Sequence, residues 1–199
     1  MSRTSALASL VLGSTLLLAG CGGDSDGDTK PSTSSSSTAA PASDAEPATG
    51  AELTGDGFTL TAPEGWKEDD GSAAPSIDFE VLALDEPQGG FADNLNVVAD
   101  PTLTRVKDLD ELYESVTPAL ESGGAKDVER EDGMTLDGSE ALVIRSKRSV
   151  GSADIDQLQL AVTHDDDGFV VTFSFGDSTS DDEQRDIAES VAATWRWTS

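Results

Sequence analysis

The alternation of apolar and polar residues between positions 158 and 175 constrains the fold of this chain more than any other feature. A period of two places successive side chains on opposite faces of a β-strand. Asp165-Asp166-Asp167-Gly168 interrupts the alternation and is typical of a hairpin turn. We therefore expect two adjacent antiparallel strands, at 155–164 and 169–175, with one buried face. The alternating apolar residues are Leu158, Leu160, Val162, Phe169, Val171, Phe173 and Phe175.

Two helices are predicted from their capping residues and apolar faces. Asp108, with Glu111 three residues later, forms a capping box for a helix that ends at Gly123-Gly124. Pro118 is expected to kink or shorten its last turn. A second helix begins after Ser180, with acidic residues at the positive end of its dipole. Its predicted buried face comprises Ile187, Ala188, Val191 and Trp195.

Apolar patterns elsewhere complete the expected architecture. The order of three strands, a helix, four strands and a helix predicts an α+β fold, with two helices packed on an antiparallel sheet of six or seven strands. The five remaining predicted strands lie at 57–61, 77–83, 95–99, 126–131 and 141–150.

Two segments of this pattern carry a family resemblance. Gly57-Phe58-Thr59-Leu60-Thr61-Ala62-Pro63-Glu64-Gly65-Trp66 and Phe91-Ala92-Asp93-Asn94-Leu95-Asn96-Val97-Val98, together with the order of elements, resemble actinobacterial LpqN-type lipoproteins. That family is similar in fold to PsbP, a photosystem II subunit. The resemblance covers about residues 53–195. It implies an αβα sandwich that acts as a binding or assembly factor and not as an enzyme.

The amino-terminal segment resembles a bacterial lipoprotein signal peptide. Arg3 precedes a largely apolar run that ends in Leu18-Ala19-Gly20-Cys21, a lipobox sequence. The resemblance implies cleavage between Gly20 and Cys21 and a lipid on the Cys21 sulfur. An uncleaved anchor helix is disfavoured, because the run is shorter than the about 20 apolar residues that span a bilayer. We expect the protein on the outer face of the cell membrane.

Composition divides the chain into three predicted parts. Residues 1–20 form the predicted signal peptide, and 21–52 a lipidated, disordered linker of Ser, Thr, Pro and Gly. Residues 53–199 form the predicted globular domain. Cys21 is the only cysteine, so the domain has no disulfide and relies on its apolar core.

Charge excludes some partners. The chain has 39 acidic and 12 basic residues, a net charge of −27, which repels nucleic acid and anionic lipid headgroups. The acidity fits solubility, attraction to cations or cationic partners, or compositional drift.

Residues typical of catalytic and metal sites are scarce. His164 is the only histidine, and it lies beside acidic residues at the end of a predicted strand. One histidine and no free cysteine argue against a serine triad or a zinc site. A calcium site at Asp165, Asp166 and Asp167 is the alternative to a plain hairpin turn. We expect no cofactor, no metal and no enzymatic activity.

Candidate binding residues are few. Arg145 and Lys147 lie on one face of a predicted strand and Arg148 on the other. They form either a patch for an anion or acidic partner, or cross-strand pairs with nearby acids. Phe91, with the loop at 85–93, is the candidate contact rim. Trp197 is expected to be partly exposed.

Two functions remain open at this point. The first is a membrane-anchored, non-catalytic binding or assembly module, monomeric and with an envelope protein as partner. The alternative is a carrier that holds a small apolar molecule or lipid between the sheet and the helices.

Overall fold

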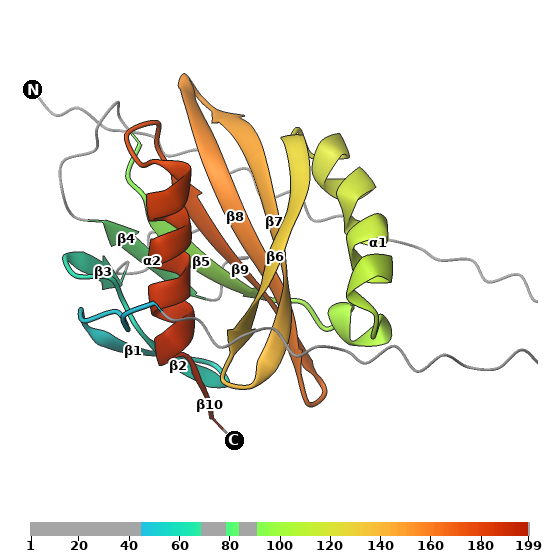
Figure 1. Cartoon of the computed structure of the whole chain (residues 1–199), viewed down its shortest axis with the longest axis horizontal. Helices are drawn as coiled ribbons and strands as arrows, with labels where there is room; N and C mark the ends of the chain where they lie inside the picture. Colours follow the sequence, from blue (N-terminus) through green and yellow to red (C-terminus); the bar gives the residue numbers. More distant parts are fainter. Residues whose placement is uncertain (1–44, 69–78, 84–90, 199) are drawn as a thin grey trace, which may run out of the picture.

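A computed structural model describes residues 45–68, 79–83 and 91–198, the range 79–83 by its backbone path alone. Within these ranges the chain forms strands, two α-helices and one 3-10 helix, in the α+β arrangement that the sequence predicts (Figure 1). The elements are β1 Glu52–Gly55, β2 Phe58–Thr61, β3 Trp66–Glu68, β4 Phe79–Ala83, β5 Asn94–Ala99, η2 Leu103–Arg105, α1 Leu109–Ser122, β6 Lys126–Leu136, β7 Ser139–Val150, β8 Ala153–His164, β9 Asp167–Phe175, α2 Asp181–Thr194 and β10 Arg196–Trp197.

The strands form two antiparallel sheets, whereas the sequence predicts one. The larger sheet has the order β3-β4-β5-β9-β8-β7-β6, and the smaller one the order β1-β2-β10. The predicted strands are present, but β1, β3 and β10 are not predicted. These three strands have two to four residues each, too few for a period of two to be recognised. Ile77, expected in the strand that becomes β4, lies outside the described residues.

Strands β6 to β9 form a continuous meander joined by two-residue turns. The predicted hairpin is confirmed, with His164 paired to Asp167 and only Asp165 and Asp166 between them. Asp165 adopts a φ of 52°, which aspartate tolerates better than most residues. The predicted acidic turn therefore closes the hairpin through backbone geometry.

Both predicted helix caps are confirmed. The Asp108 carboxylate accepts hydrogen bonds from the backbone N–H groups of Asp110 and Glu111, at 2.9 and 3.0 Å. The Ser180 hydroxyl accepts one from the N–H of Glu183 at 3.4 Å. Helix α1 continues past Pro118 to Ser122, so the proline does not shorten it.

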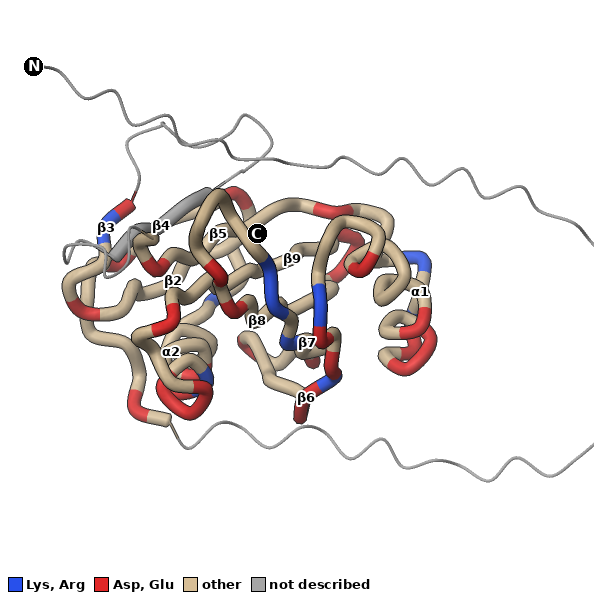
Figure 2. The backbone as a smooth tube through the Cα atoms, turned by 90° about the horizontal axis from the view of Figure 1, so that it is seen from above, with Lys and Arg blue, Asp and Glu red and all other residues tan. Residues whose placement is uncertain are grey.

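The two helices lie on opposite faces of the large sheet (Figure 1). Helix α2 and the small sheet enclose the main core, where the rings of Phe58 and Trp195 stack with centroids 4.3 Å apart. Helix α1 packs on β6 and β7 over a second cluster that includes Leu112, Leu142 and Ile144. Of the predicted buried face of α2, Ile187 is only partly buried. Figure 2 shows the acidic residues spread over both helices and several turns.

The ordered packing begins before the predicted boundary at residue 53. The N–H of Ala48 donates to the carbonyl of Ser190 on α2 at 3.0 Å, and Ala48 packs against the main core. The N–H of Gly50 donates to the carbonyl of Ala62 at 2.9 Å. The chain thus enters the folded domain on its α2 side.

Candidate functional site

Arg145 lies under α2 and is held by partners on two elements, β6 and α2. Its guanidinium forms an ion pair with Glu131 on β6 and donates to the Gln184 side chain on α2. Asp181, in the first turn of α2, lies 3.7 Å away. Only 14% of the Arg145 side chain is exposed. Its charge is therefore compensated within the fold.

Lys147 is paired across the sheet in the same way. Its Nζ lies 2.9 Å from Asp156 Oδ1 on the neighbouring strand β8, directly opposite in register. The hydrogen bond and the charge of Asp156 raise the pKa of Lys147 above its ordinary value. Both residues thus follow the cross-strand pairing alternative.

Arg148 points to the opposite face of β7, as the alternation predicts. Its Nη2 lies 3.1 Å from the position that a Cβ on Gly123 would occupy, at the carboxyl end of α1. The last turn of α1 has no basic residue of its own. Arg148 therefore places a positive charge at the negative end of the α1 dipole. The three basic residues do not form one patch.

The other predicted site residues are not brought together. Phe91 is partly buried next to Asp93, whose carboxylate accepts hydrogen bonds from the Gly176 N–H and the Thr179 hydroxyl, both at 2.8 Å. Most of the predicted contact loop at 85–93, namely residues 85–90, lies outside the described residues. Gly20 and Cys21 also lie outside them.

His164 has partners that its sequence position does not reveal. Its ring stacks on Trp197, with centroids 4.6 Å apart, and its Nδ1 lies 3.0 Å from the Ser139 hydroxyl. Trp197 is partly buried, and its Nε1 donates to the carbonyl of Leu136 at 3.1 Å. Asp165 is 3.8 Å from the other ring nitrogen and 89% exposed. Together, His164, Ser139 and Trp197 hold the carboxyl-terminal strand β10 against the β6–β7 and β8–β9 turns.

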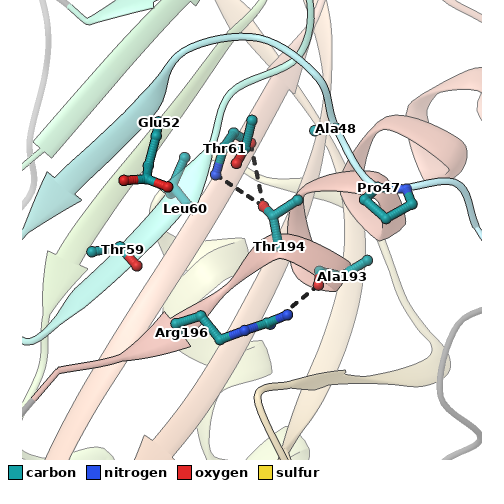
Figure 3. A pocket seen from close by; sticks show the side chains of 9 residues that line it. All are labelled: Pro47, Ala48, Glu52, Thr59, Leu60, Thr61, Ala193, Thr194 and Arg196. Carbon is teal, nitrogen blue, oxygen red and sulfur yellow. Dashed lines mark hydrogen bonds between the residues drawn. The ribbon is translucent and has the colours of Figure 1, made fainter.

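A shallow polar pocket lies at the carboxyl end of α2 (Figure 3). Its volume is about 390 Å³. Within it, the Thr194 hydroxyl accepts from the Thr61 N–H at 2.9 Å, and Arg196 donates to the carbonyl of Ala193 at 3.2 Å. This pocket does not resemble the apolar cavity between sheet and helices that a lipid carrier needs. The lining residues are Pro47, Ala48, Glu52, Thr59, Leu60, Thr61, Ala193, Thr194 and Arg196.

Two rows of uncharged polar side chains cross the large sheet on its α1 side. Gln159 belongs to this face because it pairs with Ile144 and is two residues from Ala161, both members of the α1-side cluster. We call these side chains the polar rows. In register across the strands, the first row is Gln159, Thr172 and Asn96, and the second is Ser146, Gln157, Ser174 and Asn94.

Hydrogen bonds within each polar row satisfy only some of its donors and acceptors. Gln157 donates to the Ser174 hydroxyl at 3.2 Å, and Gln159 to the Thr172 hydroxyl at 3.3 Å. Ser146 Oγ and Gln159 Oε1 are buried and have no hydrogen-bond partner within the described structure. Buried polar atoms are usually paired, so these two call for an explanation.

The rows combine buried hydroxyls with accessible amides. Ser146, Thr172 and Ser174 are 0, 7 and 4% exposed. The four amide residues Asn94, Asn96, Gln157 and Gln159 are partly exposed. Sequence reasoning missed this site because uncharged polar residues on a strand normally indicate an ordinary solvated face. Only the pairing of four strands reveals that they align.

The described ranges contain no group of three or more His, Cys, Asp or Glu residues arranged to hold a metal ion. Among the helices of these ranges, none has the length and apolar character needed to cross a bilayer.

The chain matches no protein-family model and no curated protein. Several solved structures are similar in fold. A protein from Bacteroides thetaiotaomicron is 14% identical, with a TM-score of 0.48 over 75% of this chain; the match spans about half, 49%, of that protein.

Two further similar structures are those of PsbP and LpqN, the proteins named in the sequence resemblance. Cyanobacterial PsbP from Synechocystis is 18% identical, with a TM-score of 0.49, over 72% of this chain and 88% of that one. LpqN, involved in cell envelope biogenesis of Mycobacterium tuberculosis, is 13% identical, with a TM-score of 0.48, over 75% and 86%. At these values membership of the LpqN family is not shown, and the likeness carries no argument about function.

Proposed function

We propose that this chain is a membrane-tethered, extracytoplasmic protein that binds a ligand on the polar rows without chemically changing it. The observation that carries the proposal is the alignment of seven uncharged polar side chains across four strands, two of them with an unpartnered buried oxygen. Ser146 is fully buried, so a ligand would contact the four partly exposed amide side chains of the rows, whose remaining donors and acceptors it can satisfy.

The position of the tether supports this arrangement. The lipobox ending at Cys21 supplies a lipid anchor by resemblance. The chain enters the domain through Ala48, which bonds to α2. The polar rows lie on the opposite, α1 side of the sheet. A tether on the α2 side leaves the polar rows accessible.

The surroundings of His164 favour binding over catalysis. A catalytic histidine needs one ring nitrogen for its nucleophile and the other for an orienting group. Here the ring is stacked on Trp197, and its acidic neighbour Asp165 is almost fully exposed. The Ser139–His164 contact is better explained as a stabilising pair at the hairpin ends. A serine-directed phosphonate should therefore leave Ser139 unlabelled.

Fractionation of cells that produce the full chain tests the tether. We expect the wild type in the membrane fraction and Cys21→Ser in the soluble fraction or still joined to its signal peptide. Wild-type protein that is released without detergent would contradict the proposal.

Binding is tested separately, with detergent-solubilised envelope as the source of ligand. The full chain should retain envelope material, and Gln157→Ala/Gln159→Ala should retain less. Thr135→Ala is the matched control, because this residue lies on the edge strand β6, outside the polar rows. Equal retention by all three proteins would overturn the assignment of the site.

A further inference from the structure

We infer that the ligand of the polar rows is an uncharged, polyhydroxylated chain, that is, a neutral carbohydrate. This inference rests on the proposed function and deepens it by naming the class of ligand. It depends on the hydrogen-bonding chemistry, the charge and the dimensions of the polar rows.

The chemistry of the side chains matches that of sugar hydroxyls. Each carboxamide of Gln157 and Gln159 offers two N–H donors and an oxygen acceptor. Each hydroxyl of Thr172 and Ser174 can donate or accept a hydrogen bond. Neighbouring hydroxyls of a sugar ring likewise donate and accept. Amide and hydroxyl side chains side by side can therefore satisfy adjacent hydroxyls of one ligand without burying a charge.

The charge distribution argues for a neutral ligand. The chain has a net charge of −27, which disfavours an anionic ligand over the whole surface. The seven side chains of the polar rows are uncharged, and the next position in register with Asn96, on β4, is the acidic Glu80, which also disfavours an anion. Arg148, on the same strand face two residues beyond Ser146, is placed against the end of α1. A cationic ligand would find better partners among the carboxylates elsewhere.

The size of the rows fits a chain of sugars better than a single ring. Neighbouring strands lie about 4.8 Å apart, so a row across four strands spans roughly 14 Å. Positions two residues apart along a strand are separated by roughly 7 Å, which sets the spacing between the rows. A ligand lying across the strands would contact Gln157 and Asn94 at the two sides of Ser174.

The unpartnered oxygen of Gln159 indicates where the ligand would bond most directly. Its Nε2 already donates to Thr172, while its Oε1 has no donor within the described structure. Gln159 as a whole is partly exposed, but Oε1 itself is buried, so a ligand hydroxyl would reach it only if the carboxamide turned outward and gave up its bond to Thr172. Such a bond would satisfy an acceptor that the fold leaves unpaired.

Glycan binding by the full chain with Cys21→Ser tests the inference. The probe is an array of neutral and acidic oligosaccharides, followed by titration of the bound glycan in ¹⁵N–¹H spectra. We expect neutral glycans to be retained and the side-chain amide signals of Gln157, Gln159, Asn94 and Asn96 to shift. The amide signal of Gln184, buried on the other face, should not shift.

Variants identify the site. Gln157→Ala/Gln159→Ala should weaken neutral-glycan binding at least tenfold. Thr172→Val, which replaces the hydroxyl by a methyl group of similar size, should weaken it severalfold. Thr135→Ala should bind as the wild type does. Circular dichroism establishes that each variant is folded, so that a loss of binding is not a loss of structure.

The outcomes separate this inference from the proposed function. Retention of acidic glycans alone, or of no glycan, would overturn the carbohydrate assignment. If envelope peptides then shifted the same amide signals, the binding function would stand with a different class of ligand. If neither glycans nor envelope extract shifted them, both the inference and the proposed function would fail.

Discussion

The carboxamide oxygen of Gln184, on α2, accepts a hydrogen bond from the guanidinium of Arg145, on β7. The same carboxamide donates from its nitrogen to the carbonyl of Thr179 at 2.8 Å and to Asp156 at 3.4 Å. Gln184 is fully buried, so one side chain joins the helix, its preceding loop and two strands. This contact, and not a free basic patch, explains the position of Arg145.

Replacement of Gln184 by leucine should destabilise the protein by about 2–4 kcal/mol. The change removes an acceptor for a largely buried cation and a donor for the Thr179 carbonyl, and neither can be replaced by water. The free energy of unfolding in urea measures the effect. Asp186→Ala, an exposed position on the same helix, should change it by less than about 0.5 kcal/mol. Similar losses in the two variants would contradict this role for Gln184.

The Lys147–Asp156 pair should make stability depend on pH at the alkaline end. The pKa of Lys147 is raised in the folded state from its ordinary value of 10.5. Its contribution is therefore fully present below the unfolded pKa and is lost as the pH rises through the folded pKa. We expect the wild type to exceed Lys147→Met in stability up to about pH 10, and the difference to shrink above that pH.

Urea unfolding between pH 8 and 12 measures this difference. Lys107→Met, at an exposed position, is the matched control. Because Lys147 is 56% exposed, the effect should be small and should diminish with added salt. A difference that grows with pH would have the wrong sign.

The contribution of Trp195 to stability should come from the packing of its ring and not from a hydrogen bond of its N–H group. The side chain is fully buried and stacked on Phe58, but its Nε1 has no partner in the described structure. Trp195→Ala should cost about 3–5 kcal/mol. Trp195→Phe keeps an aromatic ring against Phe58 and removes the unpaired donor, so it should cost less than half as much.

Thermal and urea unfolding of both variants compare these losses. Trp197→Phe is the informative control, because the Nε1 of Trp197 does donate, to the carbonyl of Leu136. The stability lost in Trp197→Phe should include the cost of leaving the Leu136 carbonyl unpaired. Equal losses for Trp195→Phe and Trp195→Ala would show that the indole N–H of Trp195 has a partner after all.

Gly168→Ala should destabilise the protein through a backbone clash. A Cβ at this position would lie 2.3 Å from the carbonyl oxygen of Asp100 and 2.9 Å from the Leu103 side chain. Because backbone cannot yield as a side chain does, we expect a loss of about 1–3 kcal/mol. Gly123→Ala, whose nearest neighbour is the flexible end of Arg148 at 3.1 Å, should lose less. Chemical denaturation distinguishes the two, and the reverse order would refute the packing argument.

Local patterns in the sequence predicted the elements well where they are long. The hairpin predicted at 165–168 is present, with a tighter turn of Asp165 and Asp166 because Asp167 and Gly168 belong to β9. The caps at Asp108 and Ser180 are also present. Each of these features depends on residues within a few positions. The opposite faces of Lys147 and Arg148 also follow from local alternation. Strand β10 could not be predicted, since two residues become a strand only by pairing with β2.

The candidate site could not be predicted for the same reason. Gln159 and Asn96 are 63 positions apart, and they belong to one row only because β9 lies between their strands. Nor does any local signal mark Gln184 as buried, because glutamine on a helix is normally exposed.

The amino-acid sequence alone determined which segments become strands and helices and where they are capped, since these depend on neighbouring residues. It also carries the Leu18-Ala19-Gly20-Cys21 segment on which the proposed lipid anchor rests, and the acidity of the chain. The tertiary structure decided which side chains meet. The order of strands in a sheet depends on long-range burial and pairing, and this order alone aligns the polar rows and places Arg145 beneath Gln184.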